Sequence, residues 1–227
     1  MRRLIKPGQR TTKAICVLLL VVPTAWGPAR AQSPVDQILE LVNGDIITRS
    51  DLLWSIALAT DAPSPERQIS TDILKQKMEV MIDQKLISQE AARMPAAEIS
   101  QDEINKTRNE LIAGFGSAEV FRRRVESVGL TQQRIDRLVR DMIVINKYIE
   151  FRFRSFVFVT DQEIQQYYDT KLVAELRRQN AVPPPLSEPK VRDQISAILK
   201  QQKVNDELDR FLKDLRARAD IVQLAEL

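Results

Sequence analysis

Apolar residues recur every three or four positions along most of the chain, which is the spacing of a helix with one buried face. The stretch from Thr71 to Met94 follows this spacing until Pro95 ends it. A second long stretch begins at Thr131. These patterns predict that helices make up most of the fold. The positions expected to face a core in the two stretches are Leu74, Met78, Met81, Ile82, Leu86, Ile87, Ile135, Leu138, Val139, Met142, Ile145 and Ile149.

Residues that suit helix caps stand before the periodic stretches. Ser50 followed by Asp51 predicts the start of a helix that continues to about residue 60. Ser100 with Glu103 has capping-box spacing and predicts a helix to about residue 113. The remaining expected caps are Ser117, with Gly129 after the helix end, Thr131, Thr160 paired with Glu163, and Ser187 before a last long helix to about Arg218.

Short alternating segments predict a small amount of β structure. Residues 38–42 and 45–48 flank Asn43-Gly44, the dipeptide typical of a type I′ hairpin turn. Residues 220–224 have the alternation of a strand, and Phe156-Val157-Phe158-Val159 reads as a short extended connector. A two-stranded ribbon is marginal alone, so we expect the C-terminal strand to pair with the N-terminal hairpin. The prediction is a mostly α protein with seven helices, one hairpin and one terminal strand.

The first 31 residues have the layout of a signal peptide. Six of the 34 Lys and Arg residues lie there, without any acid, around the apolar run from Ala14 to Val22. Ala29 and Ala31 suit a cleavage site, and Cys16 lies within the leader. Cleavage leaves 28 basic against 31 acidic residues in 32–227, so the basic character belongs to the leader. The apolar run is too short to span a bilayer, and we expect an exported product without stable membrane insertion.

Composition excludes several kinds of chemistry. The chain has no histidine and one cysteine, which excludes a Ser-His-Asp triad, histidine-ligated zinc and a cysteine metal cluster. No phosphate-binding glycine loop is present, and no metal or cofactor is expected. Arg122-Arg123-Arg124 resembles a nucleic-acid patch, and Arg134, Arg137 and Arg140 add a basic helical face. Acids lie among both groups, and we interpret them as solvated helix faces with i,i+3 and i,i+4 ion pairs.

The surplus of methionine and aromatic residues is the strongest indication of function. Flexible thioethers and aromatic rings adapt to varied partners, so such residues could line a surface that binds unfolded segments. The alternative for each residue is ordinary core packing, which the sequence alone does not separate from exposure. The candidate peptide-binding residues are Trp54, Met78, Met81, Met142, Tyr148, Phe151 and Phe153.

Four motifs in order resemble the SurA family of periplasmic chaperones. Residues 42–52 (VNGDIITRSDL) are similar to the hairpin-to-helix motif that opens mature members of the family. Residues 81–91 (MIDQKLISQEA) resemble the family's L-I-D-x-x-L-x-x-Q-E-A helix. Residues 99–104 (ISQDEI) and 159–164 (VTDQEI), the latter followed by Tyr167-Tyr168, resemble the two occurrences of its V-S-D-E-E-I turn. The similarity spans about residues 36–170.

The resemblance implies a peptide-binding helical domain of the SurA and trigger-factor type in residues 32–227. We divide it into a helical part (36–180), a proline-rich linker (181–187) and a C-terminal helix and strand (188–227). Members of the family usually carry a parvulin-type prolyl isomerase domain after the second turn, whereas here only a short stretch separates Tyr168 from Ser187. The implied function is therefore an ATP-independent periplasmic chaperone for unfolded exported or outer-membrane polypeptides. Prolyl isomerase activity by family association and a dedicated envelope assembly partner are the alternatives, and the oligomeric state stays open.

Overall fold

The computed structural model describes residues 36–64, 68–95 and 98–227, and residues 36–227 form one compact unit. The predicted signal peptide and its cleavage site lie outside the described residues. The protein is mostly helical, with one small antiparallel sheet, as its sequence pattern predicts.

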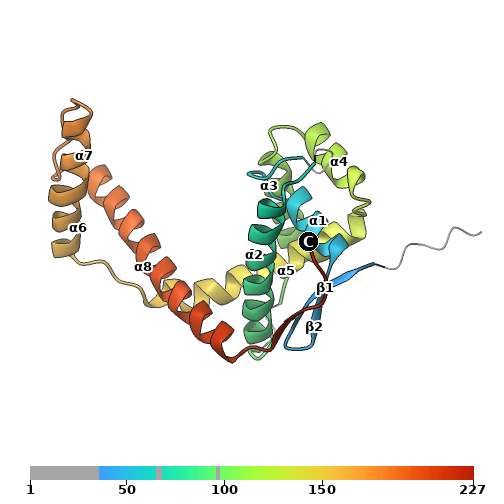
Figure 1. Cartoon of the computed structure of the whole chain (residues 1–227). Helices are drawn as coiled ribbons and strands as arrows, with labels where there is room; N and C mark the ends of the chain where they lie inside the picture. Colours follow the sequence, from blue (N-terminus) through green and yellow to red (C-terminus); the bar gives the residue numbers. More distant parts are fainter. Residues whose placement is uncertain (1–35, 65–67, 96–97) are drawn as a thin grey trace, which may run out of the picture. The chain divides into compact units, whose positions relative to one another are not determined.

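Three strands from the two ends of the described chain form the sheet (Figure 1). Strands β1 (Ile38–Val42) and β2 (Asp45–Thr48) are joined by the Asn43-Gly44 turn, where both residues have positive φ (52° and 87°) as a type I′ turn requires. Strand β3 (Ile221–Gln223) pairs antiparallel with β1, in the order β2-β1-β3. The predicted pairing of the C-terminal strand with the hairpin is therefore confirmed.

The first helix, α1 (Arg49–Ala57), begins two residues earlier than predicted and ends earlier too. Its N-cap is Thr48 and not Ser50, because Thr48 is the residue that keeps the extended conformation of β2 (φ −100°, ψ 166°). The Thr48 hydroxyl accepts a hydrogen bond from the Asp51 backbone N–H, and the Asp51 carboxylate accepts one from the Thr48 N–H. This reciprocal capping box fixes the turn from strand to helix.

The predicted caps of the middle helices are confirmed. Ser100, Ser117 and Thr131 each accept a hydrogen bond from a backbone N–H in the first turn of the helix that follows. Gly129 has a φ of 64° just after its helix ends, the conformation for which glycine is suited. The helices are α2 (Thr71–Ala91), α3 (Gln101–Ala113), α4 (Ala118–Ser127) and α5 (Gln132–Arg152).

A short 3₁₀ turn, η1 (Arg154–Phe156), follows α5, so the predicted extended connector begins only at Val157. Thr160 and Glu163 form the predicted capping box of α6 (Asp161–Tyr167). This helix continues through one π turn, η2 (Tyr168–Leu172), into α7 (Val173–Arg178). The last helix, α8 (Pro189–Arg218), begins at a proline after Glu188, so Ser187 does not cap it. Proline suits the first helical position because its missing N–H has no helical partner there.

Helix α8 takes part in three of the four apolar clusters that hold the fold together. Its first turns pack against α6 through Val191 and Ile195, its middle packs against α2 and α5 through Val204, and its end packs near the sheet through Leu215. The thirty residues of α8 give it a length of about 45 Å. Figure 1 shows α8 running from α6 and α7 to the strand β3. The fourth cluster joins α3, α4 and α5, with Ile104, Phe121 and Val139 among its buried members.

Candidate peptide-binding surface

Three of the seven candidate binding residues are buried, so the structure corrects their assignment. Met78 is only 2% exposed and packs beneath the sheet with Leu39 and Ile82. Tyr148 and Phe153 belong to an aromatic group with Phe211 of α8, where ring centroids lie 5.4–6.4 Å apart. These three side chains are core, because the helical spacing that suggested them also places residues on the inward face.

Two further candidates are partly covered. The Trp54 indole N–H donates to the Val128 carbonyl at 3.1 Å, and the Arg134 guanidinium lies 4.5 Å from the centre of its ring. Trp54 therefore joins α1 to the turn between α4 and α5. Met81 packs half-buried against the cluster beneath the sheet. Both side chains are of intermediate exposure.

Among the residues that the structure describes, the exposed aromatic side chains lie in one short stretch. Phe151 is 58% exposed, Phe156 67% and Phe158 78%. Of the predicted residues only Phe151 and Met142 are exposed, and Met142 lies more than two turns earlier on α5. Phe156 and Phe158 were not predicted as site residues, although their alternation with valines marked the connector. We call residues 151–158, which include buried Phe153, the aromatic segment.

Polar contacts fasten the aromatic segment and the residues after it to α8. The Lys203 ammonium donates to the Phe158 carbonyl at 2.8 Å and pairs with the Glu163 carboxylate at 2.6 Å. Arg154 pairs with Glu150 and donates to Gln201. The hydrogen bonds from Lys203 and Thr160 lower the pKa of Glu163 to about 2. The backbone is thus held against α8 while Phe156 and Phe158 stay exposed.

A cleft of about 510 Å³ lies between α5 and α8 beside this segment. Ile149, Val204 and Leu208 supply its apolar lining. Asn146, Gln201 and Asn205 supply amide groups, and Glu150 and Arg154 connect the cleft to the aromatic segment. Amides can donate to and accept from a polypeptide backbone. Of the aromatic segment, Arg154 lines the cleft, whereas the three exposed phenylalanines do not. A second cavity, of about 170 Å³, lies between α1, α2 and Leu227.

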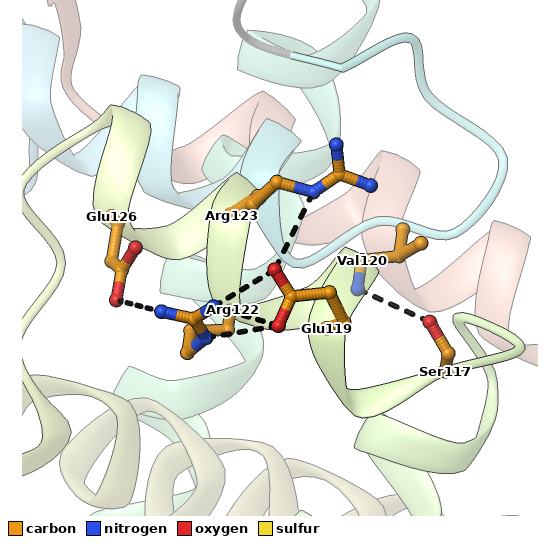
Figure 2. A network of polar contacts seen from close by, with 6 residues as sticks. All are labelled: Ser117, Glu119, Val120, Arg122, Arg123 and Glu126. Atoms are coloured by element: carbon orange, nitrogen blue, oxygen red, sulfur yellow. Dashed lines mark hydrogen bonds and ion pairs between the residues drawn. The ribbon is translucent and has the colours of Figure 1, made fainter.

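The arginine run of α4 divides into two paired residues and one buried residue. Figure 2 shows Arg122 between Glu119 and Glu126, with the nearest ion-pair atoms 2.7 Å and 3.4 Å apart, and Arg123 beside Glu119 at 3.9 Å. These two arginines form the solvated, ion-paired face that the sequence predicts. Arg124 differs from that expectation, since it is buried and sits 5.2 Å from the centre of the Phe115 ring.

Arg124 is a structural residue that the sequence interpretation missed. Its guanidinium donates to the carbonyls of Ile56 and Ala57 at the end of α1, at 2.9 Å and 3.1 Å. It also donates to the Ala59, Ala62 and Pro63 carbonyls in the following turn. Burial lowers the pKa of Arg124. Its side chain donates to carbonyls at and just after the end of α1, where intrahelical hydrogen bonds run out, and it shares those of Ile56 and Ala59 with backbone N–H groups.

Within the described ranges, no group of three or more Cys, Asp or Glu side chains is placed to hold a metal ion. In the same ranges, no helix has both the length and the apolar character needed to cross a membrane. Among known proteins, no family model and no curated protein matches the chain.

Proposed function

We propose that the protein is an exported, ATP-independent chaperone that binds unfolded polypeptide segments, including those of outer-membrane proteins. The observation that carries the proposal is the exposure of Phe151, Phe156 and Phe158 within eight residues, in a segment whose Arg154 lines the cleft between α5 and α8. Exposed large apolar groups gathered in this way are typical of interaction surfaces. The ordered motifs that resemble the SurA family, and the signal-peptide layout of residues 1–31, support the same proposal.

The arrangement suits reversible binding of many sequences. Aromatic side chains gain affinity by burying apolar area, at about 25 cal/mol per Å², and do not require a defined client sequence. Lys203 holds the backbone beside Phe158, so less conformational entropy is lost when a client binds. The polar groups of the cleft keep the neighbouring surface hydrated. Because this surface adds little apolar area to the interface, binding of a client stays reversible.

The first prediction concerns suppression of client aggregation. Light scattering of an unfolded outer-membrane polypeptide, diluted from denaturant, is expected to fall with added protein at near-equimolar ratio and without ATP. The double variant Phe156→Glu/Phe158→Glu is expected to bind the client at least about tenfold more weakly, because truncating central aromatic contacts often costs more than 1 kcal/mol each. Its melting temperature should stay close to that of the original protein, since both side chains are exposed.

The matched control is Val120→Glu/Val182→Glu, which adds the same charge at exposed apolar positions outside the aromatic segment. This control is expected to protect the client as the original protein does. Equal loss in both variants would contradict the aromatic segment as the binding site. Protection of none of several unrelated clients would contradict the chaperone proposal and favour a dedicated assembly partner. Catalysis of proline-limited refolding at substoichiometric protein would support the isomerase alternative.

A further inference from the structure

Four cations form a second surface, on α5 and α2. Arg137 and Arg140 are exposed and lie about 60° apart around α5, and Arg134 lies one turn before Arg137. Lys85 comes from α2, which packs against α5. Desolvation raises the pKa of Asp141, and the charges of Lys85, Arg137, Arg140 and Arg134 oppose that shift, so all four cations act on this one carboxylate electrostatically. We call Lys85, Arg134, Arg137 and Arg140 the basic face.

The basic face differs from the arginine run of α4 in its charge balance. Arg122 and Arg123 are each within 4.0 Å of a glutamate. None of the four cations of the basic face takes part in an ion pair with another described residue, so the ion pairs predicted for Arg134, Arg137 and Arg140 are not formed. Asp136, the other acid in this half of α5, is already paired with Arg108. Asp141 therefore offsets only one of four positive charges.

We propose that the basic face docks on the anionic headgroups of a membrane surface. A local excess of cations is complementary to an anionic partner, and Lys85, Arg134, Arg137 and Arg140 line neither of the two cavities described above. The four cations are distributed over one face and do not converge on one point. Such a distribution suits a membrane surface that is negative over its whole area, because the surface attracts each nearby Lys or Arg separately. Residues 32–227 carry a small net negative charge, so the attraction is local and orients the molecule.

The proposal does not depend on chaperone activity, and a vesicle assay tests it separately. The full chain without residues 1–31 is sedimented with vesicles of phosphatidylcholine alone, or of phosphatidylglycerol and phosphatidylcholine in equal parts. Binding is expected only to the mixed vesicles and should be lost in about 1 M salt, where the screening length falls to about 3 Å. The variant Arg137→Gln/Arg140→Gln is expected to bind the mixed vesicles about 30-fold more weakly.

Arg122→Gln/Arg123→Gln is the matched control, because it removes the same number of positive charges from the paired run of α4. Its vesicle binding should change by less than about threefold, since those charges are already offset by glutamates. Equal losses in the two variants, or equal binding to both kinds of vesicle, would overturn the proposal. Binding to a soluble acidic polypeptide but not to vesicles would overturn it in favour of an acidic protein partner. If the first variant fails to fold, the single variant Arg140→Gln tests the same face, and binding by that variant equal to the original protein's would overturn the proposal.

Discussion

At the scale of single residues, Arg124 contributes most clearly to stability. Its buried guanidinium donates to five carbonyls from Ile56 to Pro63, and its removal breaks all five hydrogen bonds, although the Ile56 and Ala59 carbonyls keep a backbone partner. Arg124→Met is expected to lower the free energy of unfolding by about 3–5 kcal/mol. Arg122→Met should cost less than about 1 kcal/mol, because its ion pairs are exposed.

The free energy of unfolding of both variants is measured by urea denaturation, with the same dependence on urea concentration (m value) used for each. A loss for Arg124→Met no larger than that for Arg122→Met would show that the carbonyl contacts contribute little. Helical spacing was the one sequence signal for this difference, since Arg124 lies three residues after Phe121 and four before Val128. Arg122 and Arg123 pair with glutamates of their own helix, whereas Arg124 donates to carbonyls more than sixty residues away. The sequence did not distinguish Met78 from Met142 either, because both fit the helical periodicity. Tertiary packing buries Met78 and leaves Met142 exposed.

At the scale of elements, local signals predicted most helix starts. Ser100, Ser117, Thr131 and Thr160 were predicted because a cap and its partner lie within three residues. The cap at Thr48 was missed, although Thr48 also lies three residues before its partner, Asp51. Ser50 was a competing candidate for the cap, and the residue at which β2 ends decides between the two. Which clusters α8 joins could not be predicted, since periodicity identifies an apolar face but not its neighbours.

The stability contributed by the contacts between α8 and the start of α6 is expected to depend on pH. The hydrogen bonds that lower the pKa of Glu163 to about 2, from an ordinary value of 4.5, stabilise the folded state while the carboxylate is charged. This contribution is fully present above pH 4.5 and is lost as the pH falls toward 2. Glu163→Gln should therefore melt below the original protein at neutral pH, and the gap should close toward pH 2.

Melting curves over this pH range test the junction, with Glu175→Gln as the control. Glu175, like Glu163, is a carboxylate paired with a basic side chain. Its partner is Arg178, and the pair lies within the single helix α7. If the difference in melting temperature between Glu163→Gln and the original protein stays constant with pH, the Glu163 charge does not have the role described.

At the scale of the whole molecule, the sheet joins residues that are far apart in the chain. The Asn43 backbone N–H donates to the Asp220 carbonyl at 2.8 Å, and the Asn43 side-chain oxygen accepts from the Asp220 N–H at 2.8 Å. Its amide nitrogen donates to Gln89 of α2 at 2.8 Å. The hairpin pattern predicted the turn and the strand pairing, but not that one asparagine would link the turn to α2 and to the chain before β3.

Asn43→Ala is expected to lower the free energy of unfolding by about 2 kcal/mol, because alanine loses both side-chain bonds and is disfavoured at positive φ. For a domain of this size that corresponds to a fall in melting temperature of about 4–8 °C. Asn43→Gly keeps the turn conformation but loses the same bonds, so the difference between the two variants separates backbone strain from long-range linkage. If glycine restores full stability, the side-chain bonds to Asp220 and Gln89 contribute nothing measurable. A loss in both variants would show that Asn43 ties the hairpin to α2 and the C-terminal strand as a single cooperative unit.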